Sequence, residues 1–154
     1  MANTQAMCTS FMGELMTGTH NFTTGTGDTF KAALYLSSAT YNAATTAYSA
    51  TGEVSSSGTN YTAGGISVTN GTSPTATNSS STAGTAYWTP TASLTYTNVT
   101  LTTAFNAVLI YNSSKANKAV SVHTFGAQTI TAGTFTLTMP TNNTVSALLR
   151  ISTT

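Results

Sequence analysis

The sequence predicts an all-β protein, an antiparallel β-sandwich that is jelly-roll-like, with one N-terminal α-helix. Two observations carry this prediction. About eight short stretches either alternate apolar with polar residues or form a brief apolar run, and turn-forming residues separate them. Threonine, which is β-branched and can hydrogen-bond water from an outer face, is abundant in these stretches. With 154 residues and 40% hydrophobic content, the chain can supply one core, so we expect residues 1–154 to form a single domain.

The helix is predicted for residues 3–18. Apolar side chains recur there every three to four residues, as on one face of a helix. They are Met7, Cys8, Phe11, Met12, Leu15 and Met16. Asn3 or Thr4 can cap the start of this helix, and Gly18 suits the left-handed residue that ends many helices. The lone cysteine of the chain lies in this stripe, and we expect it to be a small buried residue rather than a reactive thiol.

The β-sandwich is predicted for residues 28–151. Alternation predicts half-buried strands in DTFKAALYLS (28–37) and FTLTM (135–139). The continuous apolar run FNAVLIY (105–111) predicts a central strand that is covered on both faces. Thr97–Asn98, where the alternation changes phase, is expected to form a β-bulge. Further strands are predicted at 65–69, 85–89, 119–125 and 147–151.

Turn-forming residues separate these strands. They are NSSK at 112–115, TAGT at 131–134 and PTNN at 140–143. The low-complexity stretch from about residue 70 to residue 86 has no large apolar side chain, so we expect it to be an exposed loop.

Composition excludes several classes of partner. Only 5% of the residues are charged, against about 25% in an ordinary domain, and the net charge is +1. Because proteins that bind nucleic acids gather lysine and arginine on one face, we expect no nucleic-acid partner. No stretch reaches the length of a membrane span, so we expect no membrane partner. The first residues lack the basic and apolar regions of a signal peptide, which indicates a protein made in the cytoplasm of its host.

Residues that could perform catalysis are few. The chain holds Glu14, Asp28, Glu53, His20 and His123 but neither a nucleophile-elbow motif nor a dinucleotide fingerprint. A zinc site would need three or four nitrogen or sulfur ligands, and the chain offers two histidines and one cysteine. We therefore expect no enzymatic activity, no cofactor and no metal site. Sequence spacing leaves open one alternative, in which the two carboxylates Glu53 and Asp28 act as a catalytic pair.

A family resemblance adds to this interpretation. The chain resembles small Thr/Ser/Ala-rich virion structural proteins of tailed bacteriophages in the order of six segments, from residue 8 to about residue 151. They are CTSFMGELMTGTHNF, GDTFKAALYLSSATYNAATTAY, GEV, YTAGG, AYWTP and ALLRI. The resemblance implies a capsid decoration or cement protein on the exterior of the virion capsid. It also implies many copies or a homo-oligomer, and the major capsid protein as the partner.

Within that interpretation, the helix supplies a candidate interface formed by Met7, Phe11, Leu15 and Met16. Methionine adapts well to protein contact surfaces, which favours this assignment. The equal alternative is that the helix belongs entirely to the core of this chain.

A second functional alternative is a receptor- or glycan-binding module of a head or tail fibre. Tyr87 and Trp88 would then form the ligand surface, although a tryptophan at the start of a strand often packs over the end of a core. A minor tail or neck component is a third alternative.

Overall fold

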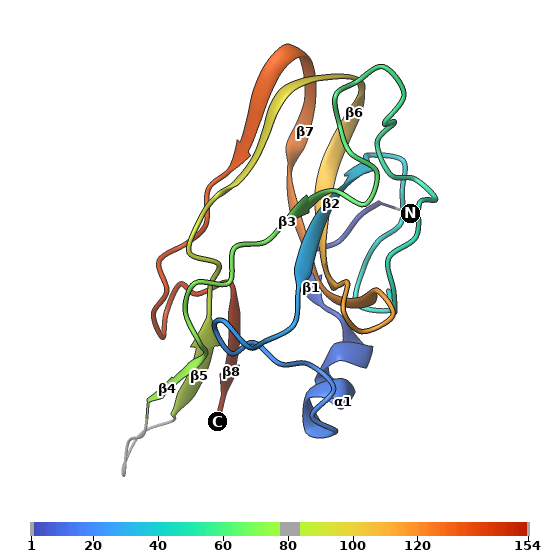
Figure 1. Cartoon of the computed structure of the whole chain (residues 1–154). Helices are drawn as coiled ribbons and strands as arrows, with labels where there is room; N and C mark the ends of the chain where they lie inside the picture. The colour runs from blue at the N-terminus through green and yellow to red at the C-terminus, as the bar shows by residue number, and fades with distance from the viewer. Residues whose placement is uncertain (1, 78–83, 154) are drawn as a thin grey trace.

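The computed structural model describes residues 2–77 and 84–153. Two antiparallel sheets and one short helix form this part of the chain (Figure 1). The larger sheet has the strand order β1-β7-β6-β2-β3, and the smaller has the order β4-β5-β8. The elements are β1 (Ala6–Met7), α1 (Thr9–Met16), β2 (Phe30–Leu36), β3 (Ile66–Ser67), β4 (Thr75–Thr77), β5 (Thr85–Trp88), β6 (Leu94–Asn112), β7 (Lys118–Leu137) and β8 (Leu149–Ser152). The all-β class with one N-terminal helix is therefore confirmed, whereas this strand order does not confirm the jelly-roll connectivity.

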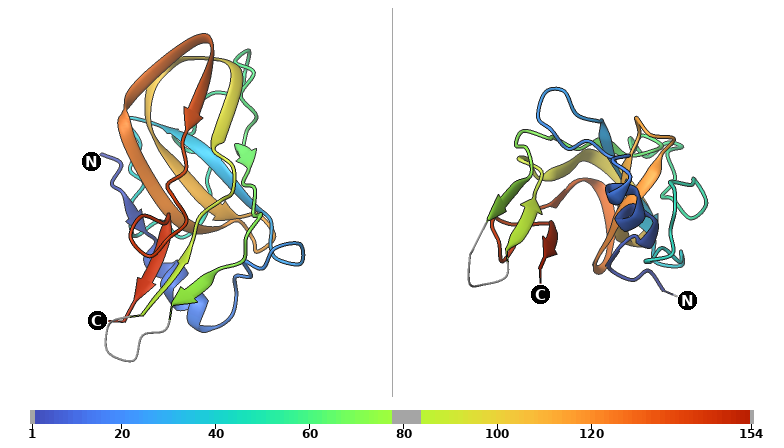
Figure 2. Two further views of the ribbon diagram at one scale, coloured as in Figure 1. Left: turned by 90° about the vertical axis from the view of Figure 1, so that its left-hand side faces the viewer. Right: turned by 90° about the horizontal axis from the view of Figure 1, so that it is seen from below.

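One long hairpin, β6 with β7, organises the molecule. Figure 1 shows both strands rising from a turn near α1, bending over at the top and descending again. The left view of Figure 2 shows that the end of the hairpin far from its turn, formed by the start of β6 and the end of β7, curls back over the end near the turn. Phe105 in β6 packs across this curl against Phe135 near the end of β7, with ring centroids 5.1 Å apart. The hairpin thereby supplies strands to two layers, which makes the fold sandwich-like.

The bend of this hairpin corrects part of the strand prediction. The predicted strand 105–111 and the stretch around the predicted bulge at Thr97–Asn98 belong to one strand, β6. The predicted strands 119–125 and 135–139 likewise lie in one strand, β7, which ends at Leu137. The predicted turn at 131–134 is wrong, because these residues continue β7 and pass through a bulge at Ala132, whose φ is 46°. The predicted bulge at Thr97–Asn98 is confirmed by a register shift after Tyr96 and by a φ of 52° at Asn98. The predicted turn at 112–115 is also confirmed.

β2 lies in the core of the larger sheet and corrects a second prediction. The alternation predicted one face toward solvent, formed by Lys31, Ala33 and Tyr35, but Ala33 and Tyr35 have no exposed surface. The segment 37–65 covers this face, and the ring of Tyr41 packs 3.7 Å from that of Tyr35. Alternation alone could not reveal this long connection. The stretch 105–111, by contrast, is a central strand covered on both faces, as predicted.

The helix is shorter than predicted. Residues 3–18 were expected to be helical, but Ala6–Met7 form β1 and pair with β7, so α1 begins at Thr9. Neither Asn3 nor Thr4 is a cap, because Cys8 precedes the helix and makes no side-chain cap hydrogen bond.

Long-range hydrogen bonds explain why the chain begins with a strand, β1, rather than with the helix. The backbone N–H of Cys8 donates to Val120 O at 3.0 Å, and the side-chain amide of Asn3 donates to Asn106 Oδ1 at 2.7 Å. These partners lie more than a hundred residues away, so helical periodicity could not predict them. Gly18, with φ 67°, follows the helix in the left-handed conformation that the sequence predicted.

The small sheet corrects the predicted loop of residues 70–86. Thr75–Thr77 form β4 and pair with β5, which begins at Thr85; residues 78–83 of the predicted loop lie outside the described residues. β8 completes this sheet, and the predicted strands at 65–69, 85–89 and 147–151 are each present with shifted ends. The small residues Thr75–Thr77 form a strand because β5 supplies hydrogen-bond partners for their backbone groups.

Candidate functional site

An apolar groove lies between α1 and the small sheet, and we call it the helix groove. Its volume is about 90 Å³, and its walls are almost wholly apolar. It is lined by Met7, Phe11, Leu15, Phe22, Pro74, Ala86, Tyr87, Trp88, Leu149 and Ile151. The structure thus brings together three residues of the predicted helix interface and both residues of the alternative ligand surface.

The two sides of α1 have different roles. Phe11 is only 1% exposed and packs edge-on against His20 and Phe22, with ring centroids at 4.9 and 5.9 Å. Met16, by contrast, is 87% exposed, and Met12 is 47% exposed. Phe11 therefore belongs to the core of this chain, whereas Met12 and Met16 have side chains that a partner could contact.

Trp88 lines the helix groove and is part of the core. Its side chain is 2% exposed, and its indole N–H donates to Asn70 Oδ1 at 3.0 Å and to Thr72 O at 3.1 Å. The ring lies edge-on against Phe22, at 4.8 Å between centroids. Trp88 therefore packs over the end of the core, while Tyr87 beside it is half-buried.

The small sheet supplies the other wall of the groove. Trp88 pairs with Leu149 and Ala86 pairs with Ile151, so these apolar residues share one face of the sheet. Leu149 is buried, whereas Ile151 is 53% exposed. The groove thus has an exposed apolar side chain on the sheet, Ile151, while the exposed Met16 of α1 follows the lining residue Leu15 in the chain.

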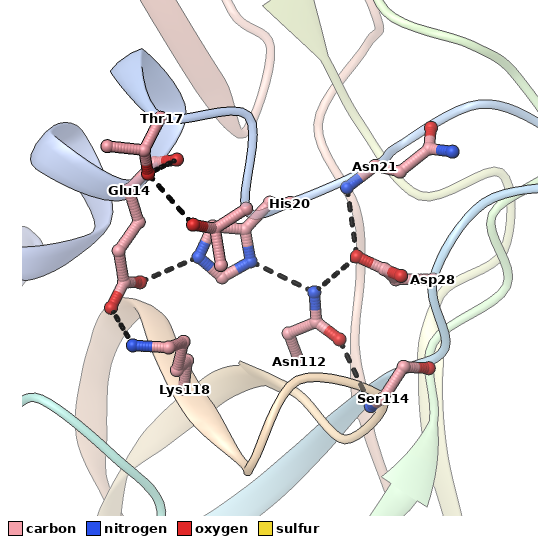
Figure 3. Close-up of polar contacts among 9 residues, drawn as sticks. Glu14, Thr17, His20, Asn21, Asp28, Asn112, Ser114 and Lys118 are labelled. Atoms are coloured by element: carbon pink, nitrogen blue, oxygen red, sulfur yellow. Dashed lines mark hydrogen bonds and ion pairs between the residues drawn. The ribbon is translucent and has the colours of Figure 1, made fainter.

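A polar network fixes α1 in place (Figure 3). The buried ring of His20 contacts Glu14 Oε2 through Nε2 at 2.7 Å and Asn112 Nδ2 through Nδ1 at 2.9 Å. Asn112 also donates to Asp28 Oδ2 at 2.7 Å. Because Asn112 uses its amide hydrogens for both contacts, His20 Nδ1 must accept and Nε2 carries the proton that it donates to Glu14.

The two carboxylates of this network are each paired with a lysine. Lys118 donates to Glu14, and Lys115 lies 3.6 Å from Asp28. Burial acts to raise the pKa of Glu14, but hydrogen bonds and charges from Lys118 and His20 outweigh it and leave that pKa lowered. For Asp28, burial is likewise outweighed, by hydrogen bonds from Asn21 and Asn112 and by Lys115, so its pKa is lowered.

Acid–base chemistry has little support in this network. Both nitrogens of His20 are engaged, and its side chain has no exposed surface. Glu14 and Asp28 each meet several donors within the chain. The network therefore connects α1 to β6 and β7 and holds one wall of the helix groove. Sequence analysis singled out Glu14, His20 and Asp28 separately, but it placed Asn112 only in a turn and had no signal for its contact with His20, which lies 92 residues away.

Glu53 belongs to a different cluster, made of tyrosines. Its carboxylate accepts hydrogen bonds from Tyr48 Oη, Tyr61 Oη and Gly64 N, each at 2.7 Å. Burial raises the pKa of Tyr61, and the hydrogen bond to Glu53 raises it further. Because Glu53 and Asp28 bond to separate sets of residues, the structure does not join them as a carboxylate pair.

The other titratable candidates are the half-buried His123 and the buried Cys8. Burial lowers the pKa of His123 to about 4, and its Nε2 lies 2.9 Å from Ser121 Oγ. Burial, followed by the charge of Glu14, raises the pKa of Cys8 to about 11, which opposes thiolate formation and supports the prediction of an unreactive thiol. Within residues 2–77 and 84–153, no group of three or more His, Cys, Asp and Glu side chains could hold a metal ion. Across the same ranges, no helix has the length and apolar character to cross a membrane.

Comparison with known proteins identifies no relative: no family model, no curated protein and no solved structure matches the chain.

Proposed function

We propose that this chain is a structural protein of a bacteriophage virion, a decoration or cement protein without enzymatic activity. In this proposal many copies lie on the capsid exterior and bind over the major capsid protein lattice. The observation that carries the proposal is the exposed apolar surface around the helix groove: Ile151 lines the groove and is exposed, and α1, whose Leu15 also lines it, exposes Met12 and Met16. Apolar surface of this kind is typical of sites that bind other proteins, and methionine adapts to such contacts.

The state of the polar residues supports a binding role over a catalytic one. Glu14, His20 and Asp28 connect α1 to the long hairpin, and Glu53 holds the tyrosine cluster. Each is engaged with partners inside the chain. A catalytic acid or base instead needs a free hydrogen-bonding position directed at a substrate.

The low charge of the chain suits a crowded shell. With a net charge of +1 and 5% charged residues, neighbouring copies repel one another little. Exposed threonines along β6 and β7 provide hydroxyl groups that water can solvate. Many such copies can therefore lie close together without long-range repulsion.

The copy number of the chain per virion tests this proposal. Quantitative mass spectrometry of purified particles, with the major capsid protein as the internal reference, should give a copy number comparable to that of the capsid subunits. A handful of copies would contradict the decoration role and favour a fibre module or a tail or neck component. The fibre alternative has less support, because Trp88 is buried and offers no exposed ring on which a sugar could stack.

A further inference from the structure

The outer edge of β8 pairs with no other strand of residues 2–77 and 84–153. β8 is an edge strand and pairs with β5 alone within the described part of the chain. Thr153 N donates to Gly84 O, which extends the same ladder, and hydrogen-bonded and non-hydrogen-bonded pairs alternate along an antiparallel ladder. The N–H and C=O groups of Arg150 and Ser152 therefore point away from β5, where another strand can pair with them.

Two hollows flank this free edge. Leu149 and Ile151 line the helix groove on one face of β8. Leu148 and Arg150 line a second hollow on the other face, with a volume of about 350 Å³. Its remaining lining residues are Gln5, Met7, His123, Pro140, Ser146 and Ala147. The edge of β8 thus lies between an apolar hollow and a more polar one.

The edge strand of the larger sheet borders the same region. Met7 of β1 lines both hollows. Because Cys8 N bonds to Val120 O, the alternation of the ladder directs the backbone of Met7 away from β7. Figure 2 shows β8, in dark red, as the strand of the small sheet nearest to β1 and α1, in dark blue. We call the region bordered by β8, Met7 and the two hollows the strand slot.

We propose that the strand slot binds an extended segment of a partner protein, which adds to β8 as a further strand of the small sheet. Edge strands with free backbone groups bind peptides in this way: main-chain hydrogen bonds give affinity, and pockets for alternate side chains give specificity. The two hollows lie on opposite faces of the sheet. Successive side chains of the added strand therefore enter the helix groove and the second hollow in turn.

The chemistry of the hollows specifies the side chains of the partner segment. Those that enter the helix groove meet apolar walls and are aliphatic. Those on the opposite face meet Arg150, the one arginine of the sequence, whose side chain is exposed and makes no ion pair in the described residues. An acidic side chain on that face complements the guanidinium. The partner segment therefore alternates aliphatic residues with polar or acidic ones.

This inference deepens the proposed function, because it states how a partner is held at the helix groove. It rests on the proposed function only in taking the segment from a capsid protein. Strand addition itself can be tested with a synthetic peptide.

Two variants at one position isolate the backbone contact. Ser152→Pro removes the outward N–H and places a ring at the edge of β8, whereas Ser152→Ala keeps the N–H. Both variants lose the same hydroxyl contact, 3.1 Å from Thr85 Oγ1, so that loss does not distinguish them. Circular dichroism and the thermal midpoint establish that both are folded before binding is compared.

The probe is a nine-residue peptide, Thr-Val-Glu-Val-Thr-Val-Glu-Val-Thr, blocked at both ends, with a scrambled peptide of the same composition as control. Isothermal titration should give saturable binding of the alternating peptide to the full chain and to Ser152→Ala. Binding to Ser152→Pro should be weaker by at least about tenfold. Amide exchange measured by NMR should show new protection at Arg150 and Ser152. Equal binding to both variants, equal binding of the scrambled peptide, or no binding would each overturn the proposal.

Assays with virus shells separate this inference from the proposed function. If the chain binds purified shells and Ser152→Pro binds as well as Ser152→Ala, strand addition is wrong while the decoration role stands. If the alternating peptide binds as expected but shells do not, the decoration role is wrong while strand addition stands. If sedimentation shows dimers that Ser152→Pro abolishes, the slot holds a second copy of this chain and the partner segment is overturned.

Discussion

Nδ1 of His20 accepts a 2.9 Å hydrogen bond from the side-chain amide of Asn112, which has no exposed surface and also donates to Asp28. Asn112→Asp should therefore destabilise the fold strongly. It removes both donated hydrogens and places a carboxylate 2.7 Å from Asp28 Oδ2. We expect a loss of about 2–4 kcal/mol in the free energy of unfolding, measured by urea denaturation.

Asn106 provides the matched control on the same strand. Its Oδ1 accepts a hydrogen bond from Asn3 at 2.7 Å, and an aspartate can accept the same bond. Asn106→Asp should therefore change the free energy of unfolding by less than about 1 kcal/mol. Equal losses in the two variants would show that the donors of Asn112 do not hold the network together.

The Glu53 cluster predicts a graded effect of two substitutions. Glu53→Gln keeps an oxygen that can accept from Tyr61 and Gly64, and the Tyr48 hydroxyl can turn to accept from the new amide. Its expected loss of stability is about 1–2 kcal/mol. Glu53→Ala leaves all three donors without an acceptor, and we expect a loss of about 3 kcal/mol or more. Similar losses for the two variants in urea denaturation would contradict the role given to the carboxylate.

Stability should fall as the pH is lowered from 6.5 toward 4. Burial lowers the pKa of His123 to about 4 in the folded chain, whereas an unfolded histidine has a pKa of about 6.5. Between pH 6.5 and pH 4 the unfolded chain binds a proton at His123 that the folded chain does not. The contribution of neutral His123 to the free energy of unfolding is therefore complete above pH 6.5 and is lost as the pH falls toward 4. A shift of this size corresponds to at most about 3 kcal/mol.

His123→Gln provides the test of this assignment. The variant has no titrating side chain at this position, so its stability should vary less between pH 6.5 and pH 4 than that of the parent chain. Glu14 and Asp28, whose pKa values are lowered, add a loss of stability at still lower pH in both proteins. Thermal midpoints measured across the pH series would disprove the assignment if the two profiles had the same slope.

The sequence predicted the features of this fold that depend on nearby residues. The apolar run 105–111 lies in a central strand, and Thr97–Asn98 form the bulge where the alternation changes phase. Gly18 ends the helix with a positive φ. These features follow from side-chain periodicity and backbone preference within a few residues, which can be seen in one sequence.

Contacts between distant residues decided the features that the sequence did not predict. Residues 6–7 became a strand because β7 pairs with them, and Tyr35 is buried because the segment 37–65 folds over it. The helix groove joins α1 to β5 and β8, more than seventy residues apart, so its residues could be proposed but not brought together. The local pattern at Asn112 predicted a turn but not its contacts with His20 and Asp28. Long-range pairing overrides local propensity at each of these positions.

Gly65 should be far less tolerant of substitution than Gly58. Both have positive φ values, 75° and 68°, so alanine is strained at either position. At Gly65 a Cβ would also collide with the backbone of Ala32 and Ala33 in β2, whereas at Gly58 it would meet open space. We expect Gly58→Ala to lower the free energy of unfolding by about 1–2 kcal/mol and Gly65→Ala by about 3 kcal/mol or more. Equal effects would show that segment 37–65 does not pack closely on β2.

Two charged substitutions on α1 should separate folding from docking. Phe11→Glu places a charge among buried aromatic rings, so the isolated chain should fail to fold, as circular dichroism would show. Met16→Glu alters a side chain that is 87% exposed, so its thermal midpoint should stay close to that of the parent chain. Under the proposed function, Met16→Glu should bind purified shells at least about tenfold more weakly in a co-sedimentation assay, because a buried charge opposes docking. Thr134→Glu, which adds the same charge at an exposed position of β7 rather than α1, should bind as the parent does. If Met16→Glu also binds normally, the exposed side of α1 is not the contact surface.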